Sequence, residues 1–165
     1  MQPPKTPPVP TLDWSSAIGL FLINFGTLDL LAQDVLQSIL PPDEFSRFRD
    51  RYFHDRIKRL KEHVGTADYP PEKKQAMAQF FDRLEPTRLL RNHIAHGLLR
   101  IALAEDHKTT VLTLSLPRDL DGSNSPDAQH LTHQELLTAS TALTALIEDF
   151  KHLFGNWVVD ADIRF

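Results

Sequence analysis

Residues 91–97 read Arg91-Asn92-His93-Ile94-Ala95-His96-Gly97, and the hydrophobic pattern of the chain changes across this stretch. On its N-terminal side, apolar residues recur every three or four positions, which predicts helices. Gly97 is predicted to follow the last helical residue in a left-handed turn. On the C-terminal side, residues 98–103 and 109–116 are rich in strand-forming residues and are joined by the polar residues 105–108. A small β-hairpin is therefore expected directly after the helix.

Two further helices are predicted nearer the N-terminus. The first spans residues 13–40, with Asp13 as its cap, and ends before Pro41. The second spans residues 43–64 and is expected to stop at Gly65. The apolar stripe of this second helix consists of Phe45, Phe48, Tyr52, Phe53, Ile57, Leu60 and Val64.

The third predicted helix follows residues 69–71 and ends at Gly97. Pro86 removes one backbone donor and disfavours helix at the preceding residue, so a kink or a short restart is expected there. Residues 117–131 are predicted to be a loop, and residues 132–135 read as a capping box that opens the last long helix. The sequence therefore predicts a mainly α protein, a bundle of four or five helices with a small β-hairpin between the third and fourth long helices.

The composition is typical of one soluble domain. A chain of 165 residues is long enough to bury a core without metal or disulfides, and the absence of cysteine excludes thiol catalysis. Residues 1–12 are rich in proline and predict a disordered tail, which leaves 13–165 as the domain. Because we recognise no leader and no apolar run of about 18 residues, we expect a cytoplasmic protein without membrane contact.

The charge of the chain bears on possible nucleic-acid binding. A net charge of −4 gives no global attraction to nucleic acid, so phosphate binding would require a local basic patch. The most basic stretch is the predicted second helix, residues 43–64. It is interpreted either as a solvated face with ion pairs three or four residues apart, which we favour, or as a ligand-binding patch.

The end of the third helix holds the candidate functional residues. Arg88, Asn92 and His96 are spaced at four residues and share one helix face. Arg91 lies about 140° around the helix from His96 at ideal geometry. Arg91 therefore needs its long side chain, or a second subunit, to meet His96. His93 belongs to the same cluster.

An arginine and a histidine are sufficient for one kind of phosphodiester cleavage. Histidine accepts a proton near neutral pH, and arginine matches phosphate oxygens with a planar fork. In RNA the 2′-hydroxyl is a built-in nucleophile, so a base and a cation could act without metal. Structural interpretations also exist, with His96 stabilising a helix end, Arg91 paired to a first-helix carboxylate and Asn92 capping a carbonyl.

Zinc binding is the remaining chemical alternative. His93 and His96, or His130 and His133, are spaced at i and i+3 as zinc ligands can be. The chain offers neither cysteine nor a clear third ligand. We therefore predict no metal site and no cofactor.

The form Arg91-Asn92-His93-Ile94-Ala95-His96-Gly97 resembles the signature of the HEPN superfamily, an arginine followed after four to six residues by a histidine. The residue-level match is confined to this heptad. The resemblance implies a helical bundle that usually dimerises, and many members are metal-independent ribonucleases of toxin–antitoxin, phage-defence or CRISPR systems. Others have lost catalysis and serve as binding modules.

Carried over to this chain, the resemblance implies Arg91 and His96 as the catalytic pair, with Asn92 orienting one of them. Asp29 on the first helix is the candidate that completes the site, with His93 and Arg88 as supporting residues. Two hypotheses follow. The first is a homodimeric RNA endonuclease with an RNA substrate and a possible antitoxin partner. The second is an inactive module for dimerisation or partner binding, with Arg91 and His96 buried or tied into internal hydrogen bonds.

Overall fold

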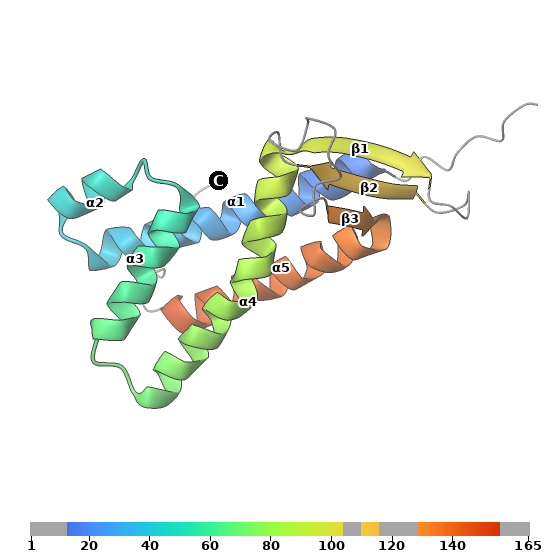
Figure 1. Ribbon diagram of the computed structural model, residues 1–165. Helices are drawn as coiled ribbons and strands as arrows, with labels where there is room; N and C mark the ends of the chain where they lie inside the picture. Colours follow the sequence, from blue (N-terminus) through green and yellow to red (C-terminus); the bar gives the residue numbers. More distant parts are fainter. Residues whose placement is uncertain (1–12, 104–109, 116–128, 156–165) are drawn as a thin grey trace, which may run out of the picture.

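The computed structural model describes residues 13–103, 110–115 and 129–155. Within these ranges the protein is mainly helical, with five helices and one small antiparallel sheet (Figure 1). The predicted tail (1–12) and hairpin turn (105–108) lie outside the described residues. In chain order the elements are α1 (Trp14–Ile39), α2 (Pro42–Phe48), α3 (Phe53–Thr66), α4 (Pro71–His96), β1 (Leu98–Leu103), β2 (Thr110–Ser115), β3 (Gln129–Thr132) and α5 (His133–Phe154).

Helix α1 supplies the central apolar face of the core. The carboxylate of Asp13 caps it by accepting a hydrogen bond from the Ser16 backbone N–H at 2.9 Å, which confirms the predicted start. Helices α3, α4 and α5 all contact α1, so its buried face joins the bundle. This face follows the helical period and consists of Trp14, Ala17, Phe21, Phe25, Leu28, Leu31, Ala32, Val35 and Leu36.

The predicted second helix is two helices, α2 and α3, separated by residues 49–52. The chain changes direction at this break. Phe53 is therefore buried, at 9% exposed, and packs edge-on against Phe25. Tyr52, predicted in the apolar stripe, is instead 85% exposed. Gly65 does not stop α3, because the helix continues to Thr66 before the proline pair that begins α4.

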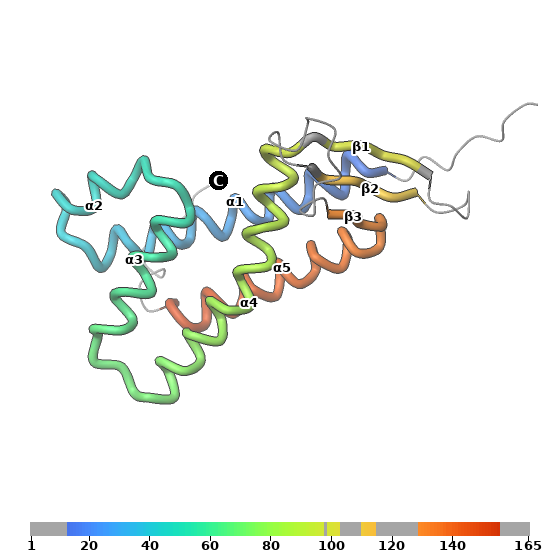
Figure 2. The backbone as a smooth tube through the Cα atoms, viewed as in Figure 1, coloured from blue at the N-terminus to red at the C-terminus, as the bar shows by residue number. Residues whose placement is uncertain are grey.

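An aromatic cluster fixes the crossing of α4 and α5. The Phe80 ring lies edge-on to Phe81 and Phe150, with centroids 5.6 Å apart in both pairs. Phe150 stacks on Phe154 with centroids 4.6 Å apart. Aromatic pairs of this kind contribute about 0.5–1.5 kcal/mol each beyond their burial. Figure 2 shows that α4 continues from its crossing with α5 to the sheet, next to which residues 91–97 lie.

Helix α4 is continuous through Pro86, so the predicted restart is wrong. Proline removes the hydrogen bond that its N–H would donate to the carbonyl of Asp82, four residues earlier. Both Pro86 and Asp82 are exposed, and water can satisfy that carbonyl. The helix therefore reaches His96 without interruption.

The sheet is larger than the predicted hairpin. β1 pairs antiparallel with β2, as expected, and β2 pairs with β3 in the order β1-β2-β3. Residues 129–131, predicted as loop, form β3, in which Leu131 lies opposite Leu112. Gly97 has φ −87° and ψ 165°, an extended conformation. The predicted left-handed turn is wrong because β1 begins at the next residue.

Helix α1 also meets the length and composition criteria of a membrane span, with a mean hydropathy of 1.5 over 18 residues. The sequence-based expectation considered unbroken apolar runs, whereas this criterion averages hydropathy over the window and so tolerates single polar residues. One third of the window is buried inside the structure. Core helices of folded domains satisfy the same criteria.

The capping box of α5 is confirmed and yields a stability prediction. The Glu135 backbone N–H donates to Thr132 Oγ1 at 3.2 Å, and the Thr132 N–H donates to Glu135 Oε2 at 2.7 Å. Thr132→Ala is expected to lower the free energy of unfolding by about 0.5–2 kcal/mol, measured by chemical denaturation. Thr141→Ala, an exposed threonine inside the same helix, should change it by less than about 0.5 kcal/mol. Equal effects of the two substitutions would contradict this prediction.

Candidate functional site

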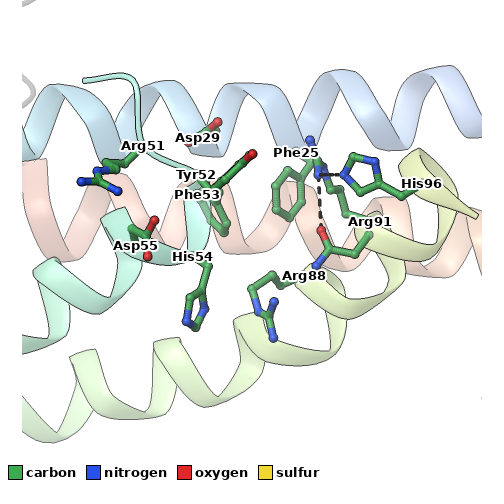
Figure 3. Close-up of a pocket in the computed structure, with 11 residues that line it drawn as sticks. Phe25, Asp29, Arg51, Tyr52, Phe53, His54, Asp55, Arg88, Arg91 and His96 are labelled. Atoms are coloured by element: carbon green, nitrogen blue, oxygen red, sulfur yellow. Dashed lines mark hydrogen bonds between the residues drawn. The ribbon is translucent and has the colours of Figure 1, made fainter. Parts of the chain in front are cut away.

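A cleft of about 600 Å³ lies where the end of α4 faces α1 and the beginning of α3 (Figure 3). It combines three arginines, two histidines, three aromatic rings, two aspartates and an asparagine. The residues that line it are Phe25, Asp29, Arg51, Tyr52, Phe53, His54, Asp55, Arg88, Arg91, Asn92 and His96. The structure thus brings five of the six sequence-predicted site residues to one cleft.

Arg91 is the centre of the hydrogen-bond network in this cleft. Its Nη1 lies 3.3 Å from His96 Nε2 and donates to Asn92 Oδ1 at 3.3 Å (Figure 3). Its guanidinium carbon lies over the Phe25 ring, 5.6 Å from the centroid, in a cation–π contact. The long arginine side chain spans the separation around the helix, so the pair meets within one chain.

The hydrogen bond between Arg91 and His96 requires a particular protonation of the imidazole ring. Arginine has donors only, so a hydrogen bond from Arg91 requires Nε2 of His96 to accept and to carry no proton. Among the described residues, the Nε and Nη2 groups of Arg91 have no hydrogen-bond partner, and Arg91 forms no ion pair. The Arg91 side chain is half-buried and His96 is exposed. An incoming anion can therefore reach both.

His93 does not belong to the cleft lining. Its Nδ1 lies 2.9 Å from the carbonyl oxygen of Leu89, one turn earlier in α4, and therefore carries the ring proton. Its Nε2 is buried and has no hydrogen-bond partner within the described part of the chain. His93 thus packs against its own helix, and the predicted supporting role has no geometric basis in the cleft.

Arg88 lines the cleft, but its fork is occupied. Its Nε donates to Glu85 Oε2 at 2.9 Å and its Nη2 donates to Oε1, so the pair is bidentate. The hydrogen bonds from Arg88 hold the pKa of the Glu85 carboxyl below its ordinary value. The charge of Arg88 is therefore largely balanced before any ligand arrives.

Asp29 also lines the cleft, and its carboxylate is bound to Arg56 of α3. Arg56 is 9% exposed, and its Nη2 donates to the backbone carbonyl of Arg49 at 2.8 Å. This pair ties α1 to the break between α2 and α3. The carboxylate that could have paired with Arg91 is thus engaged by a different arginine.

The cleft contains six residues that were not predicted as site residues. One of them, Phe25, lies in the predicted first helix, and the other five fall within the predicted continuous second helix: Arg51, Tyr52, Phe53, His54 and Asp55. The residues of the break between α2 and α3 reach the cleft because the chain turns there. The high density of basic residues in the stretch 43–64 was the sequence feature that could have indicated a binding site there.

The basic residues of the stretch 43–64 fall into two groups, one forming ion pairs and one without them. Arg59 is paired with Glu44 and Glu62, at 3.0 and 3.7 Å, as a solvated ion-pair face predicts. Arg47, Arg51 and Lys58 form no ion pair with any residue in the described ranges. These three side chains line a second hollow of about 340 Å³, which shares Arg51 with the main cleft.

Similarity to known proteins and metal-ligand geometry give this cleft no functional assignment. No protein-family model, curated protein or solved structure matches the chain. Among residues 13–103, 110–115 and 129–155, no three histidine, aspartate or glutamate side chains come together as metal ligands. The chemistry of the cleft therefore has to be argued from its own residues.

The ion pair of Asp29 yields a second prediction. Asp29→Asn removes the charge that compensates the buried guanidinium of Arg56, and should lower the free energy of unfolding by about 1–3 kcal/mol. Asp34→Asn is the matched control on the same helix, because Asp34 has no ion pair among the described residues and burial raises the pKa of its carboxyl. It should change stability by less than about 0.5 kcal/mol. If Asp29→Asn unfolded like the wild type, its carboxylate would serve the cleft rather than the fold.

Proposed function

We propose that this protein is a metal-independent RNA endonuclease of the HEPN type. The observation that carries the proposal is the contact between Arg91 Nη1 and His96 Nε2 in an open cleft. A fixed arginine fork beside an unprotonated imidazole nitrogen is suited to binding a phosphodiester and removing a nearby proton. The Arg-Asn-x-x-Ala-His-Gly sequence that carries these groups supports the same assignment.

The proposed reaction uses the 2′-hydroxyl of the RNA as nucleophile. The phosphate enters beside Arg91, whose Nε and Nη2 donors, without partners among the described residues, bind its non-bridging oxygens and stabilise the charge of the phosphorane. The hydrogen bond from Arg91 Nη1 to His96 Nε2 breaks as Nε2 takes the proton of the 2′-hydroxyl, and the 2′-oxygen forms a bond to phosphorus. The bond from phosphorus to the 5′-oxygen breaks, that oxygen takes a proton from water, and the hydroxide so formed takes the proton from the His96 imidazolium, which restores the base. The products are a 2′,3′-cyclic phosphate and a 5′-hydroxyl. Asn92 holds the Nη1 side of Arg91 in place.

The cleavage proposal is tested with purified full-length protein and labelled single-stranded RNA in the presence of EDTA. His96→Ala removes the base and is expected to lower the cleavage rate at least about 100-fold. Arg91→Ala should have an effect of similar size, and Arg91→Lys should recover only part of the rate because lysine keeps the charge without the fork. His152→Ala, an exposed histidine on α5, is the matched control and should cleave like the wild type.

Several results would contradict the proposal. One is intact RNA with the wild-type protein over a range of pH. Another is cleavage that persists in His96→Ala or disappears with EDTA. Product ends other than a 2′,3′-cyclic phosphate and a 5′-hydroxyl would also argue against the 2′-hydroxyl as nucleophile.

The alternative function is a non-catalytic dimerisation or binding module. The internal hydrogen bonds of Arg91 fit this alternative, whereas the exposure of His96 in the cleft does not. A specific observation favours dimerisation under either function. Leu20, Ile23 and Leu30 are 47%, 69% and 63% exposed and share one face of α1. Residues 14–28, which include Leu20 and Ile23, carry no charge, so two copies can meet there without repulsion, whereas Asp34 lies one turn beyond Leu30 on the same face.

The proposed homodimer is tested by sedimentation equilibrium of the full chain. Ile23→Glu places a charge at the centre of the exposed face and should convert a wild-type dimer to a monomer, because burying an unpaired carboxylate is costly. Ala142→Glu adds the same charge at an exposed position of α5 and should leave the dimer intact. A wild-type protein that stays monomeric at every concentration would overturn the proposal.

A further inference from the structure

Tyr52 has a fixed backbone and an exposed side chain at the edge of the cleft. It is the N-cap of α3, and its carbonyl oxygen accepts hydrogen bonds from the backbone N–H groups of Asp55 and Arg56, at 3.0 and 3.2 Å. The next residue, Phe53, is buried against Phe25. These contacts hold the position from which the Tyr52 side chain projects.

The Tyr52 side chain contributes little to the fold. The residue is 85% exposed, more than any other large apolar side chain in the described part of the chain. Its hydroxyl has no hydrogen-bond partner among the described residues. The ring nevertheless lines the cleft that holds Arg91 and His96 (Figure 3). An anchored, solvent-facing aromatic ring beside a phosphate-binding group is the arrangement on which unpaired bases stack.

The positive charge continues beyond Tyr52 and away from His96. Its neighbour Arg51 lines both the main cleft and the second hollow, where Arg47 and Lys58 also lie. None of these three cations is paired to a carboxylate within the described ranges. Asp55 and Glu62 also line the second hollow, where Glu62 pairs with Arg59 and the other three cations outnumber Asp55. A nucleic-acid strand could therefore keep its backbone near net positive charge on both sides of the ring, although the whole protein is acidic.

We infer that Tyr52 is a specificity residue of this cleft, whose ring stacks on one unpaired base of the bound strand. The inference rests on the proposed function, because it concerns the same site. A duplex keeps its bases stacked on one another and offers no free face to the ring, so Tyr52 selects for single strands. The ring acts through stacking rather than through its hydroxyl. Tyr52 is thus a specificity residue and not part of the reacting pair.

The test measures binding without cleavage. A fluorescent strand with methylated 2′-hydroxyls, which cannot act as nucleophiles, is titrated with the full-length protein alone or annealed to its complement. The wild type should bind the single strand more tightly than the duplex. Tyr52→Ala should weaken single-strand binding by about 5- to 100-fold, the range for loss of one stacked base, and remove the preference. Tyr52→Phe keeps the ring and should bind like the wild type.

A matched control and a crosslink complete the experiment. Leu89→Ala removes an exposed apolar side chain of α4 that is 42% exposed and outside the cleft lining, and it should leave binding unchanged. Ultraviolet crosslinking of the wild-type protein to an RNA strand containing 5-iodouracil should place the adduct on Tyr52, as mapped by mass spectrometry. This second measurement needs no substitution and is independent of how well the variants fold.

The outcomes separate the inference from the proposed function. Unchanged binding by Tyr52→Ala, or crosslinks only elsewhere, would overturn the stacking role while leaving the cleavage proposal to its own test with His96→Ala. Loss of binding in both Tyr52→Ala and Tyr52→Phe would assign the effect to the hydroxyl and overturn stacking. A wild type that neither binds nor cleaves RNA would overturn both and point to a protein partner.

Discussion

The ring of Phe25 on α1 contacts two other helices, and the geometry of the cleft depends on these contacts. One side meets Phe53 at the start of α3, with centroids 4.7 Å apart, and the guanidinium of Arg91 on α4 lies over the ring. Phe25 is 3% exposed and held by the core. Its ring therefore gives Arg91 a rigid support, and the same packing sets the distance between the end of α4 and the turn before α3.

Charge pairing explains how an acidic protein can contain a cationic cleft. Arg56 is neutralised by Asp29, and Arg88 is neutralised by Glu85. Arg51 and Arg91 have no ion pair among the described residues, so their charge acts on the solvent and on an incoming anion. The net charge of −4 is a sum over the whole chain and says little about this local field.

Much of the helical framework could be predicted from local chemistry. The ends of α1 follow from the capping carboxylate of Asp13 and the proline pair after Leu40, and the start of α5 follows from the Thr132–Glu135 capping box. The break before α3 could not be predicted, because its residues have helical spacing and the turn is stabilised by packing of Phe53 on Phe25. β3 was missed because four residues in a polar segment pair only when β2 is beside them.

The candidate site, too, could be predicted only in part from local sequence. Spacing along one helix was enough to place Arg88, Asn92 and His96 together and to mark Arg91 as the residue whose reach had to be tested, because the helical period is a local property. Spacing could not reveal which carboxylate each arginine meets, nor that Arg51, Tyr52 and His54 join the cleft. Those contacts join residues that are far apart in the chain, and their partners are selected by how the helices pack.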